Sequence, residues 1–399
     1  MIGGIMGEKN LDFDTVIERK NTKSLKYDFA KERGMPEDVL PLWVADMDFK
    51  VSSYIIEALN DMNAHSIFGY SEGTGEYFNA VKGWMKRQYN WDVKENWLIK
   101  TPGIVYALAM AVKAYTKENE SVLIQSPVYY PFSEVIQDNH RKLVTNELKQ
   151  DLDGSYRMDF EDFEEKVVKE KVKLFFLCNP HNPVGRVWTK EELQIIGDIC
   201  CRHNVIVVSD EIHADFSFRR KHTVFTEVRK AYESIGMVCT SPSKTFNIAG
   251  FQVSNIFIPN EELREKLKKE IAASGYSQLN LSGLTACEAA YQHGDEWLKE
   301  VKKYICGNAA FVKEYLKKEL PKVKMTELEG TYLIWLDFRQ YGLSDMELNR
   351  QIIYNAKLWL DAGNIFGITG QGFQRMNIAC PRSVLAEALN RLASAFKNL

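Results

Sequence analysis

The chain has 399 residues, of which 45% are hydrophobic and 26% are charged, as in a soluble globular protein. That length exceeds one ordinary hydrophobic core, so two domains are expected. The net charge of −3 gives no electrostatic reason to expect nucleic acid or a membrane surface as a partner. No apolar run approaches the roughly 20 residues that a spanning helix needs, and residues 1–10 lack the features of a signal peptide.

From about residue 100 onward, short runs rich in strand formers alternate with helical stretches. Residues 104–116 and 190–203 are predicted helices, and Thr189 with Glu192 forms a predicted capping box before the second one. Because the strands are almost continuously apolar, we expect a mostly parallel sheet covered on both faces. The predicted strands are 121–126, 173–178, 205–209, 237–240 and 254–258.

The C-terminal part has a different pattern. Residues 295–316 are charged and helical in period, and residues 331–338 and 373–379 are rich in strand formers. This pattern predicts a second, smaller α+β domain.

The seven cysteines are odd in number and include no C-x-x-C pair. Several lie in apolar runs, so we interpret them as buried thiols of a cytoplasmic protein. The histidines show no ligand spacing shared with the cysteines, and no metal site is expected. The cysteines are Cys178, Cys200, Cys201, Cys239, Cys287, Cys306 and Cys380.

Lys244 lies between small hydroxyl residues, in the run from Ser241 to Gly250 that follows a predicted strand. A desolvated lysine loses its proton more readily and becomes a nucleophile for Schiff-base chemistry. The neighbouring serines offer hydroxyl groups for an anion such as a phosphate ester. A covalent lysine next to a phosphate site suggests pyridoxal phosphate (PLP), although an exposed turn with the same residues is an equal alternative.

Polar residues also follow two other predicted strands. Asn182 lies in the run 179–185, and Asp210 lies in the run 209–213. Open α/β sheets bind ligands at the carboxyl edge, where an asparagine can donate to a phenolate oxygen and an aspartate can pair with a pyridinium. Each segment alone is also compatible with a plain turn or a helix N-cap. The presence of three such segments in one chain favours a ligand-binding site over plain turns or helix caps.

The order Asn182, Asp210, Lys244, Arg375 resembles the fold-type I PLP enzymes, the aspartate aminotransferase superfamily. The resemblance runs from about Val39 to Arg382. Finer features resemble the MalY/PatB branch of cystathionine β-lyases and related C–S lyases. These features are the segments 39–49, 210–213, 243–250 and 372–377.

The resemblance implies a specific α/β architecture. A large PLP-binding domain, residues 51–297, would contain a mostly parallel seven-stranded sheet flanked by helices. A small α+β domain would combine residues 1–50 and 298–399. The family also implies a homodimer with the site at the subunit interface, and Tyr70 resembles the tyrosine that reaches the phosphate of the neighbouring subunit.

The resemblance further implies roles around the cofactor. Asp210 is expected to hold the pyridinium proton, and Asn182 and His213 are expected near the 3-oxygen of the ring. Tyr129 resembles the aromatic residue that stacks on the ring, with Tyr130 as a rival. The expected phosphate-binding residues are Gly103, Ile104, Val105, Ser241 and Ser243, of which the first three start a predicted helix.

A substrate site is also expected. Arg375 lies in an otherwise apolar segment, and a buried arginine needs an anionic partner, which we assign as the α-carboxylate of an amino acid. Asn182 is expected to contact the same carboxylate, and Ala45 in Trp43-Val-Ala45 is expected over the substrate entrance. No second obvious substrate arginine is present, which argues mildly against dicarboxylate substrates.

Gln252 departs from the aminotransferase pattern, in which an arginine often lies eight residues after the lysine. The lyase branch commonly lacks this arginine. We therefore predict β-elimination of cystathionine or a related amino-acid thioether to a thiol, pyruvate and ammonia, with Lys244 as general base. The alternatives are an aminotransferase and a PLP-bound regulatory protein.

Overall fold

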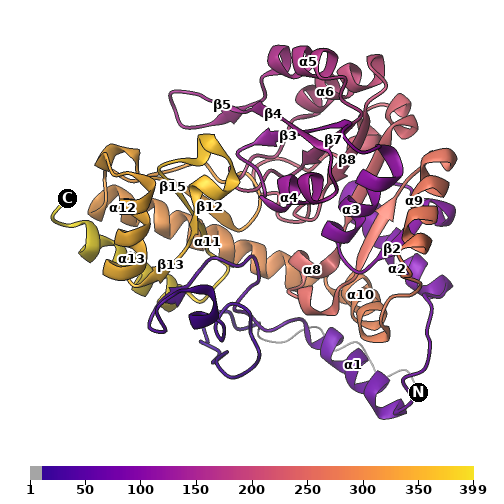
Figure 1. The fold of residues 1–399 in the computed structure, drawn as a ribbon. Coiled ribbons are helices and arrows are strands. Elements are labelled where there is room, and N and C mark those ends of the chain that lie inside the picture. The colour runs from indigo at the N-terminus through magenta and orange to yellow at the C-terminus, as the bar shows by residue number, and fades with distance from the viewer. Residues whose placement is uncertain (1–10) are drawn as a thin grey trace.

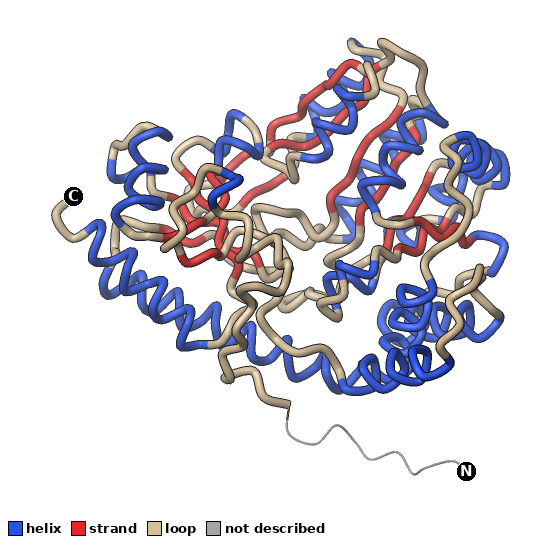
Figure 2. Tube along the Cα trace, turned by 60° about the horizontal axis from the view of Figure 1, so that its bottom comes forward, coloured by secondary structure: helices blue, strands red, loops and turns tan. Residues whose placement is uncertain are grey.

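The computed structural model describes residues 11–399, so the expectation of no signal peptide in residues 1–10 lies outside the described part. Two sheets, of seven and four strands, lie at opposite ends of the molecule (Figure 1). The long helix α11 (Asp295–Glu319) runs along one side from the larger sheet to the smaller one (Figure 2).

The larger sheet is mixed, with the strand order β2-β10-β9-β8-β7-β3-β4. Only β10 runs against its neighbours, so the predicted mostly parallel, seven-stranded α/β sheet is confirmed. All five predicted strands are present within one residue at either end. The strands are β2 (Leu98–Thr101), β3 (Ser121–Ser126), β4 (Lys142–Glu147), β7 (Leu174–Cys178), β8 (Ile206–Asp210), β9 (Gly236–Thr240) and β10 (Ser254–Phe257).

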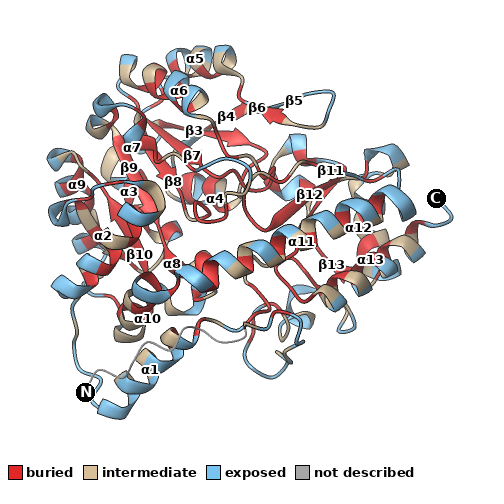
Figure 3. Ribbon diagram, turned by 180° about the vertical axis from the view of Figure 1, so that it is seen from behind, coloured by how far each residue is buried: buried red, intermediate tan, exposed pale blue. Residues whose placement is uncertain are grey.

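Helices cover both faces of this sheet because successive side chains of a strand point to opposite faces. Phe176 packs on one face with α3 (Ile104–Tyr115), α4 (Pro131–Asp138) and α9 (Glu261–Ala273). Phe175 packs on the other face with α5 (Phe160–Lys169), α6 (Lys190–Arg202) and α7 (Phe225–Val228). The predicted capping box of Thr189 and Glu192 starts α6. The inner strands are buried almost throughout, whereas β2 and β4 at the two edges are only partly buried (Figure 3).

Three further helices pack near the β2–β10 end of the large sheet, where α10 contacts both of the others. They are α1 (Ser53–His65), α2 (Gly75–Tyr89) and α10 (Leu281–His293). α1 contacts α10 but buries only Ile55, and its outer face is largely exposed (Figure 3). A small hairpin of β5 (Lys149–Gln150) and β6 (Tyr156–Arg157) projects from the opposite edge, after β4.

The smaller sheet is antiparallel, in the order β11-β12-β15-β14, and α12 (Asp345–Arg350) and α13 (Arg382–Phe396) belong to the same end of the chain. Its strands are β11 (Lys324–Met325), β12 (Leu333–Asp337), β14 (Asp361–Ala362) and β15 (Phe373–Asn377). The N-terminal segment joins this end, because β1 (Leu40–Pro41) pairs in parallel with β13 (Leu358–Trp359).

This pairing supports the grouping of residues 1–50 with 298–399, and we keep the division into these segments and residues 51–297 as a proposal. The boundary at 297/298 falls near the start of α11, which continues without a break to Glu319.

The described residues give further results on membranes, metals and thiols. None of the helices between residues 11 and 399 combines the length and apolarity needed to cross a membrane. Within the same residues, no group of three or more His, Cys, Asp or Glu side chains is arranged to hold a metal ion. The prediction of buried thiols is wrong for Cys306, which is exposed, and for Cys201, which is partly exposed. Each lies on an amphipathic helix, and an apolar residue there is not buried unless it faces the core.

Candidate active site

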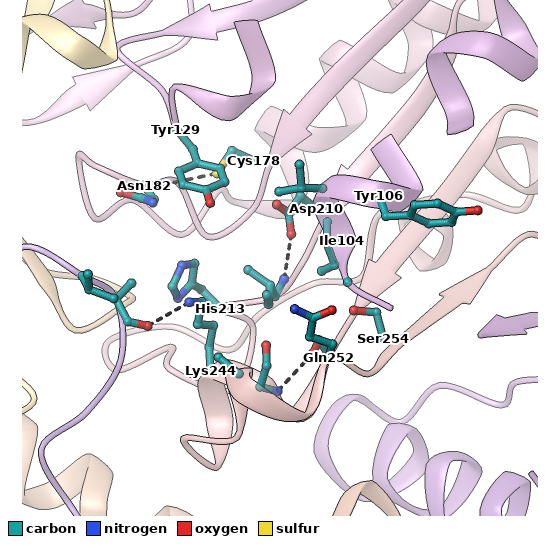
Figure 4. Close-up of a pocket in the computed structure, with 18 of the residues that line it drawn as sticks. Ile104, Tyr106, Tyr129, Cys178, Asn182, Asp210, His213, Lys244, Gln252 and Ser254 are labelled. Carbon is teal, nitrogen blue, oxygen red and sulfur yellow. Dashed lines mark hydrogen bonds between the residues drawn. The ribbon is translucent and has the colours of Figure 1, made fainter. Parts of the chain in front are cut away.

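A pocket of about 630 Å³ lies at the carboxyl ends of the parallel strands and extends to the smaller sheet. Figure 4 shows labelled side chains from several segments that surround a common space. All but one of the predicted site residues line this pocket. They are Ala45, Gly103, Ile104, Val105, Tyr129, Asn182, Asp210, His213, Ser241, Ser243, Lys244 and Arg375.

Lys244 belongs to the short helix α8 (Pro242–Thr245), which follows β9 directly. Its Nζ donates to the backbone oxygen of Ala45 at 2.8 Å, and the hydroxyl of Tyr332 donates to the same oxygen at 2.9 Å. Removal from water lowers the pKa of Lys244 to about 8, and the charge of Arg375 acts in the same direction. The amine is therefore closer to its reactive, neutral form than a surface lysine is.

Hydrogen bonds to the carboxylate of Asp215 hold the turn that carries Lys244 in place. The hydroxyl of Thr245 donates to Asp215 at 2.6 Å, and Tyr89 donates to the other oxygen of the same carboxylate. Asp215 lies two residues after His213, so this contact ties the two polar segments of the site together. The hydroxyl of Ser241 accepts from the backbone N–H of Ser243 at 3.1 Å and starts α8.

Asp210 is the last residue of β8, and its carboxylate accepts the backbone N–H of Ile212 at 3.1 Å. Burial raises the pKa of Asp210 to about 7. His213 is also buried, and burial lowers its pKa to about 3, with Lys244 and Arg375 adding to the effect. The imidazole is therefore neutral near pH 7. A polar ligand group that hydrogen-bonds to Asp210 or His213 would offset the free-energy cost of burying that side chain.

Tyr129 and Tyr130 both line the pocket, with ring centroids 5.6 Å apart. Burial raises the pKa of both, and Asp361 and Arg375 influence both hydroxyl groups. Tyr129 is influenced by Asp210, whereas Tyr130 is influenced by Arg33 at the N-terminal segment. Tyr129 packs against Phe132 of α4, and Tyr130 packs against Phe366.

The other end of the pocket is formed by the start of α3. Its N-cap residue is Gly103, with a φ of 150°. No N-cap side chain therefore occupies the first backbone N–H groups of the helix. A Cβ built on Gly103 meets no atom within 4 Å, so space is open in front of the first helical N–H groups. Free N–H groups at a helix start form an anion site. Gln252 and Ser254, the second of which was not predicted, also line the pocket.

Arg375 lies in the middle of β15 with its guanidinium almost completely buried. Nη1 donates to Oδ1 of Asn182 at 3.0 Å, and Nη2 donates to the backbone oxygen of Trp43 at 2.8 Å. Nη2 also forms an ion pair with Asp361, the residue directly opposite on β14. Phe366 covers the guanidinium at 4.9 Å from the ring centroid. The anionic partner that a buried arginine requires is thus already supplied by the chain.

The segment 43–48 closes the pocket from the N-terminal side. The side-chain amide of Asn377 donates to the backbone oxygens of Val44 and Asp46 at 2.7 and 2.6 Å. Buried Lys26 forms an ion pair with Asp48 at 2.8 Å. The expectation that Ala45 lies against the substrate entrance is consistent with this geometry.

Tyr70 is the one predicted residue that the structure does not bring to the pocket. It is fully exposed on the single chain, in the segment between α1 and α2. Asp361, Tyr332 and Cys178 were not identified from the sequence as residues of the site. Asp361 and Tyr332 reach the site through pairings of the small sheet, for which no local motif exists. Cys178 is the last residue of β7, where the strand-end pattern could have indicated it.

The pocket residues fit PLP. Two buried nitrogens, Nδ1 of His213 and Nε of Arg375, have no hydrogen-bond partner among the described residues. A buried polar atom without a partner favours a polar ligand at that place. The pocket combines an amine, a buried carboxylate and an open helix start, which match the aldehyde, the pyridine nitrogen and the phosphate of PLP.

Comparisons with known proteins agree with this chemistry. The chain is 43% identical to cystathionine beta-lyase PatB of Bacillus subtilis (strain 168), over 96% of this chain and 100% of that protein. A PLP-bound putative aminotransferase from Clostridium difficile 630 has a TM-score of 0.94 at 42% identity, covering 97% of this chain and 100% of that one. Cystalysin from Treponema denticola, which contains pyridoxal 5'-phosphate, has a TM-score of 0.94 at 39% identity, covering 98% and 99%.

The family model for aminotransferase class I and II matches residues 37–392. This range includes every segment that lines the pocket except the one around Leu25. The chain belongs to the class I and II aminotransferase family, whose members use PLP.

Proposed function

We propose that the chain is a PLP-dependent C–S β-lyase, which converts cystathionine or a related cysteine thioether and water to a thiol, pyruvate and ammonia. The observation that carries this proposal is the pocket in which Lys244, Asp210 and Arg375 meet, in a chain 43% identical to a cystathionine β-lyase. PLP, when bound, supplies an electron sink for the carbanion that forms at the substrate Cα.

The chain's own residues would perform the remaining steps. Nζ of Lys244 holds PLP covalently and, once free, takes the proton from the substrate Cα. The backbone oxygen of Ala45 accepts from this amine and keeps it near the reacting carbon. The Asp210 carboxylate holds the proton of the pyridine nitrogen. The sulfur leaves from Cβ with the bonding electron pair, as a thiolate.

Arg375 orients the substrate by its α-carboxylate, assisted by Asn182. Tyr129, rather than Tyr130, stacks on the ring, because its side chain lies at the pocket beside Asn182 (Figure 4). His213 and Asn182 bind the 3-oxygen. The phosphate is held by the start of α3 and by the α8 turn, through Gly103, Ile104, Val105, Ser241 and Ser243.

The proposal includes a homodimer in the cytoplasm, with Tyr70 reaching the phosphate of the neighbouring subunit. Full exposure of Tyr70, together with exposed Ile67 and Phe68 in the same segment, supports an interface there. The free cysteines among the described residues support a reducing compartment. Light scattering of the wild type and of Tyr70→Ala, each with and without PLP, tests the oligomer and the role of Tyr70.

Pyruvate and free thiol should be measured together with purified protein, PLP and L-cystathionine, without a keto acid. Equal, catalytic release of both products supports the lyase. Absence of pyruvate, with amino-group transfer once 2-oxoglutarate is added, would instead identify an aminotransferase. Lys244→Ala is the matched negative control, and retained turnover in this variant would refute the role of Lys244.

A further inference from the structure

Arg33 ends a short 3-10 turn (Lys31–Arg33) and lies against Trp43, a residue of the pocket lining. Its Cζ lies 5.2 Å from the ring centroid of Trp43, which lines the pocket and stacks on Trp359 at 4.5 Å. Arg33 is exposed, and its guanidinium forms no ion pair with another residue between 11 and 399. A cation next to the pocket thus has no anionic partner in the described part of the chain.

Tyr130 lines the pocket together with Trp43 and Arg375. Burial raises the pKa of its hydroxyl, while the charges of Arg375 and Arg33 both act in the opposite direction. Both guanidinium groups are therefore close to one phenol that lines the pocket. Trp43 contacts both arginines. Its backbone oxygen accepts a hydrogen bond from Arg375, and its ring lies under the guanidinium of Arg33.

Two arginines placed in this way match a substrate with two separated carboxylates. Cystathionine has one carboxylate next to the carbon that loses its proton and a second one at the far end of the leaving group. Arg375 is assigned to the first. The part of the substrate beyond sulfur must extend away from the ring, and Arg33 lies against Trp43, a residue of the pocket lining.

We propose that Arg33 binds the distal carboxylate of the leaving group and makes this site selective for thioethers that carry a carboxylate on the leaving group. The proposal rests on the proposed lyase function and assigns its substrate class. It would add a second substrate arginine, from the N-terminal segment, which the sequence analysis did not identify.

Arg33→Met should be tested as the full-length, PLP-loaded protein with two cysteine thioethers. S-(2-carboxyethyl)-L-cysteine has a carboxylate on the leaving group, and S-propyl-L-cysteine is of similar size without one. The ratio of the KM for the first to the KM for the second should rise about tenfold relative to the wild type, as for loss of a charge-assisted hydrogen bond. Lys31→Met, in the same turn, should leave the ratio within about twofold of the wild type.

Binding gives a second readout that does not need turnover. Suberate has two carboxylates separated by as many chain atoms as those of cystathionine, and octanoate is its monocarboxylate counterpart. Calorimetry should show that suberate binds the wild type more tightly than Arg33→Met does, with a preference that weakens as salt rises. Octanoate should not distinguish the two proteins.

The outcomes separate the two proposals. If the wild type releases no pyruvate from L-cystathionine or from either of the two thioethers, the lyase function fails. If it is a lyase and Arg33→Met raises both KM values equally, Arg33 only supports Trp43, and the assignment to the distal carboxylate is wrong. An unchanged KM ratio together with equal suberate binding would overturn it as well.

Discussion

The two walls of the pocket differ in how far their charges are compensated within the chain. On the large-sheet wall, defined by Asp210, His213 and Lys244, each polar group has few partners and a strongly shifted pKa. On the small-sheet wall, defined by Asp361 and Arg375, the guanidinium has a carboxylate, an amide and a backbone oxygen around it. The large-sheet wall therefore offers polar groups that a ligand can pair with, whereas the charge of Arg375 on the small-sheet wall is already neutralised by Asp361.

The difference has a physical reason. Asp210 is the last residue of β8 and Lys244 follows the end of the neighbouring parallel strand β9, where the chain leaves the sheet. Asp361 and Arg375 instead face each other across an antiparallel ladder, which places a partner opposite each side chain. Perturbed pKa values concentrate on the first wall, as is typical of the reacting part of an active site.

The largest effect is expected from Lys244→Ala on the large-sheet wall. Removal of the amine abolishes the covalent attachment of PLP and the base that takes the α-proton, so turnover should fall by about 1,000-fold or more. The visible absorbance of lysine-bound PLP should disappear, while the fold stays intact by circular dichroism. An exposed lysine such as Lys303, changed to alanine, serves as control.

Asp210→Asn should lower kcat by about 100-fold, the range typical of losing one partner of a buried charge pair. The amide has the same shape but cannot neutralise a protonated pyridine nitrogen. Because Asp210 is also buried, PLP content must be measured from the absorbance spectrum alongside kcat. A variant that keeps both PLP and the wild-type kcat would show that Asp210 has only a structural role.

A smaller effect concerns the reactivity of Lys244 before PLP is bound. Since burial lowers its pKa to about 8, the neutral amine fraction falls as pH drops below that value. The rate of PLP attachment to cofactor-free protein should thus fall about tenfold per pH unit below pH 8, and level off above it. The same series with a free alkylamine, whose pKa is ordinary, corrects for the titration of PLP itself. A break near pH 10 in both series would contradict the lowered pKa.

The sequence predicted the large-sheet wall much better than the small-sheet wall. Asp210 and Lys244 were identified because each follows an apolar run that a local pattern detects. Asp361 and Tyr332 were missed because their contacts depend on which strands of the small sheet pair, and this is a non-local property. The expected partner of Arg375 was a substrate, whereas the pairing of β14 with β15 supplies Asp361. Cys306 was misjudged because composition does not tell which face of a helix is buried.

Asp361→Asn tests whether Asp361 competes with the substrate α-carboxylate for Arg375. Asp361 and the backbone oxygen of Trp43 both accept from Nη2 of Arg375, so an α-carboxylate that arrives must share this guanidinium with a like charge. Neutralising Asp361 should lower KM for amino-acid substrates by about fivefold, with little change in kcat. The free energy of unfolding should fall by about 3 kcal/mol, because Arg375 loses its buried counter-ion.

Asp361→Glu is the matched control, since it keeps the charge and should not lower KM. Steady-state kinetics and urea unfolding of the three proteins, each loaded with PLP, separate the two effects. A higher KM in Asp361→Asn would mean that Asp361 orients Arg375 for the substrate instead of competing with it. In that case the small-sheet wall would be a positioning device, and its internal ion pair would contribute to catalysis in the same way as the open groups of the large-sheet wall.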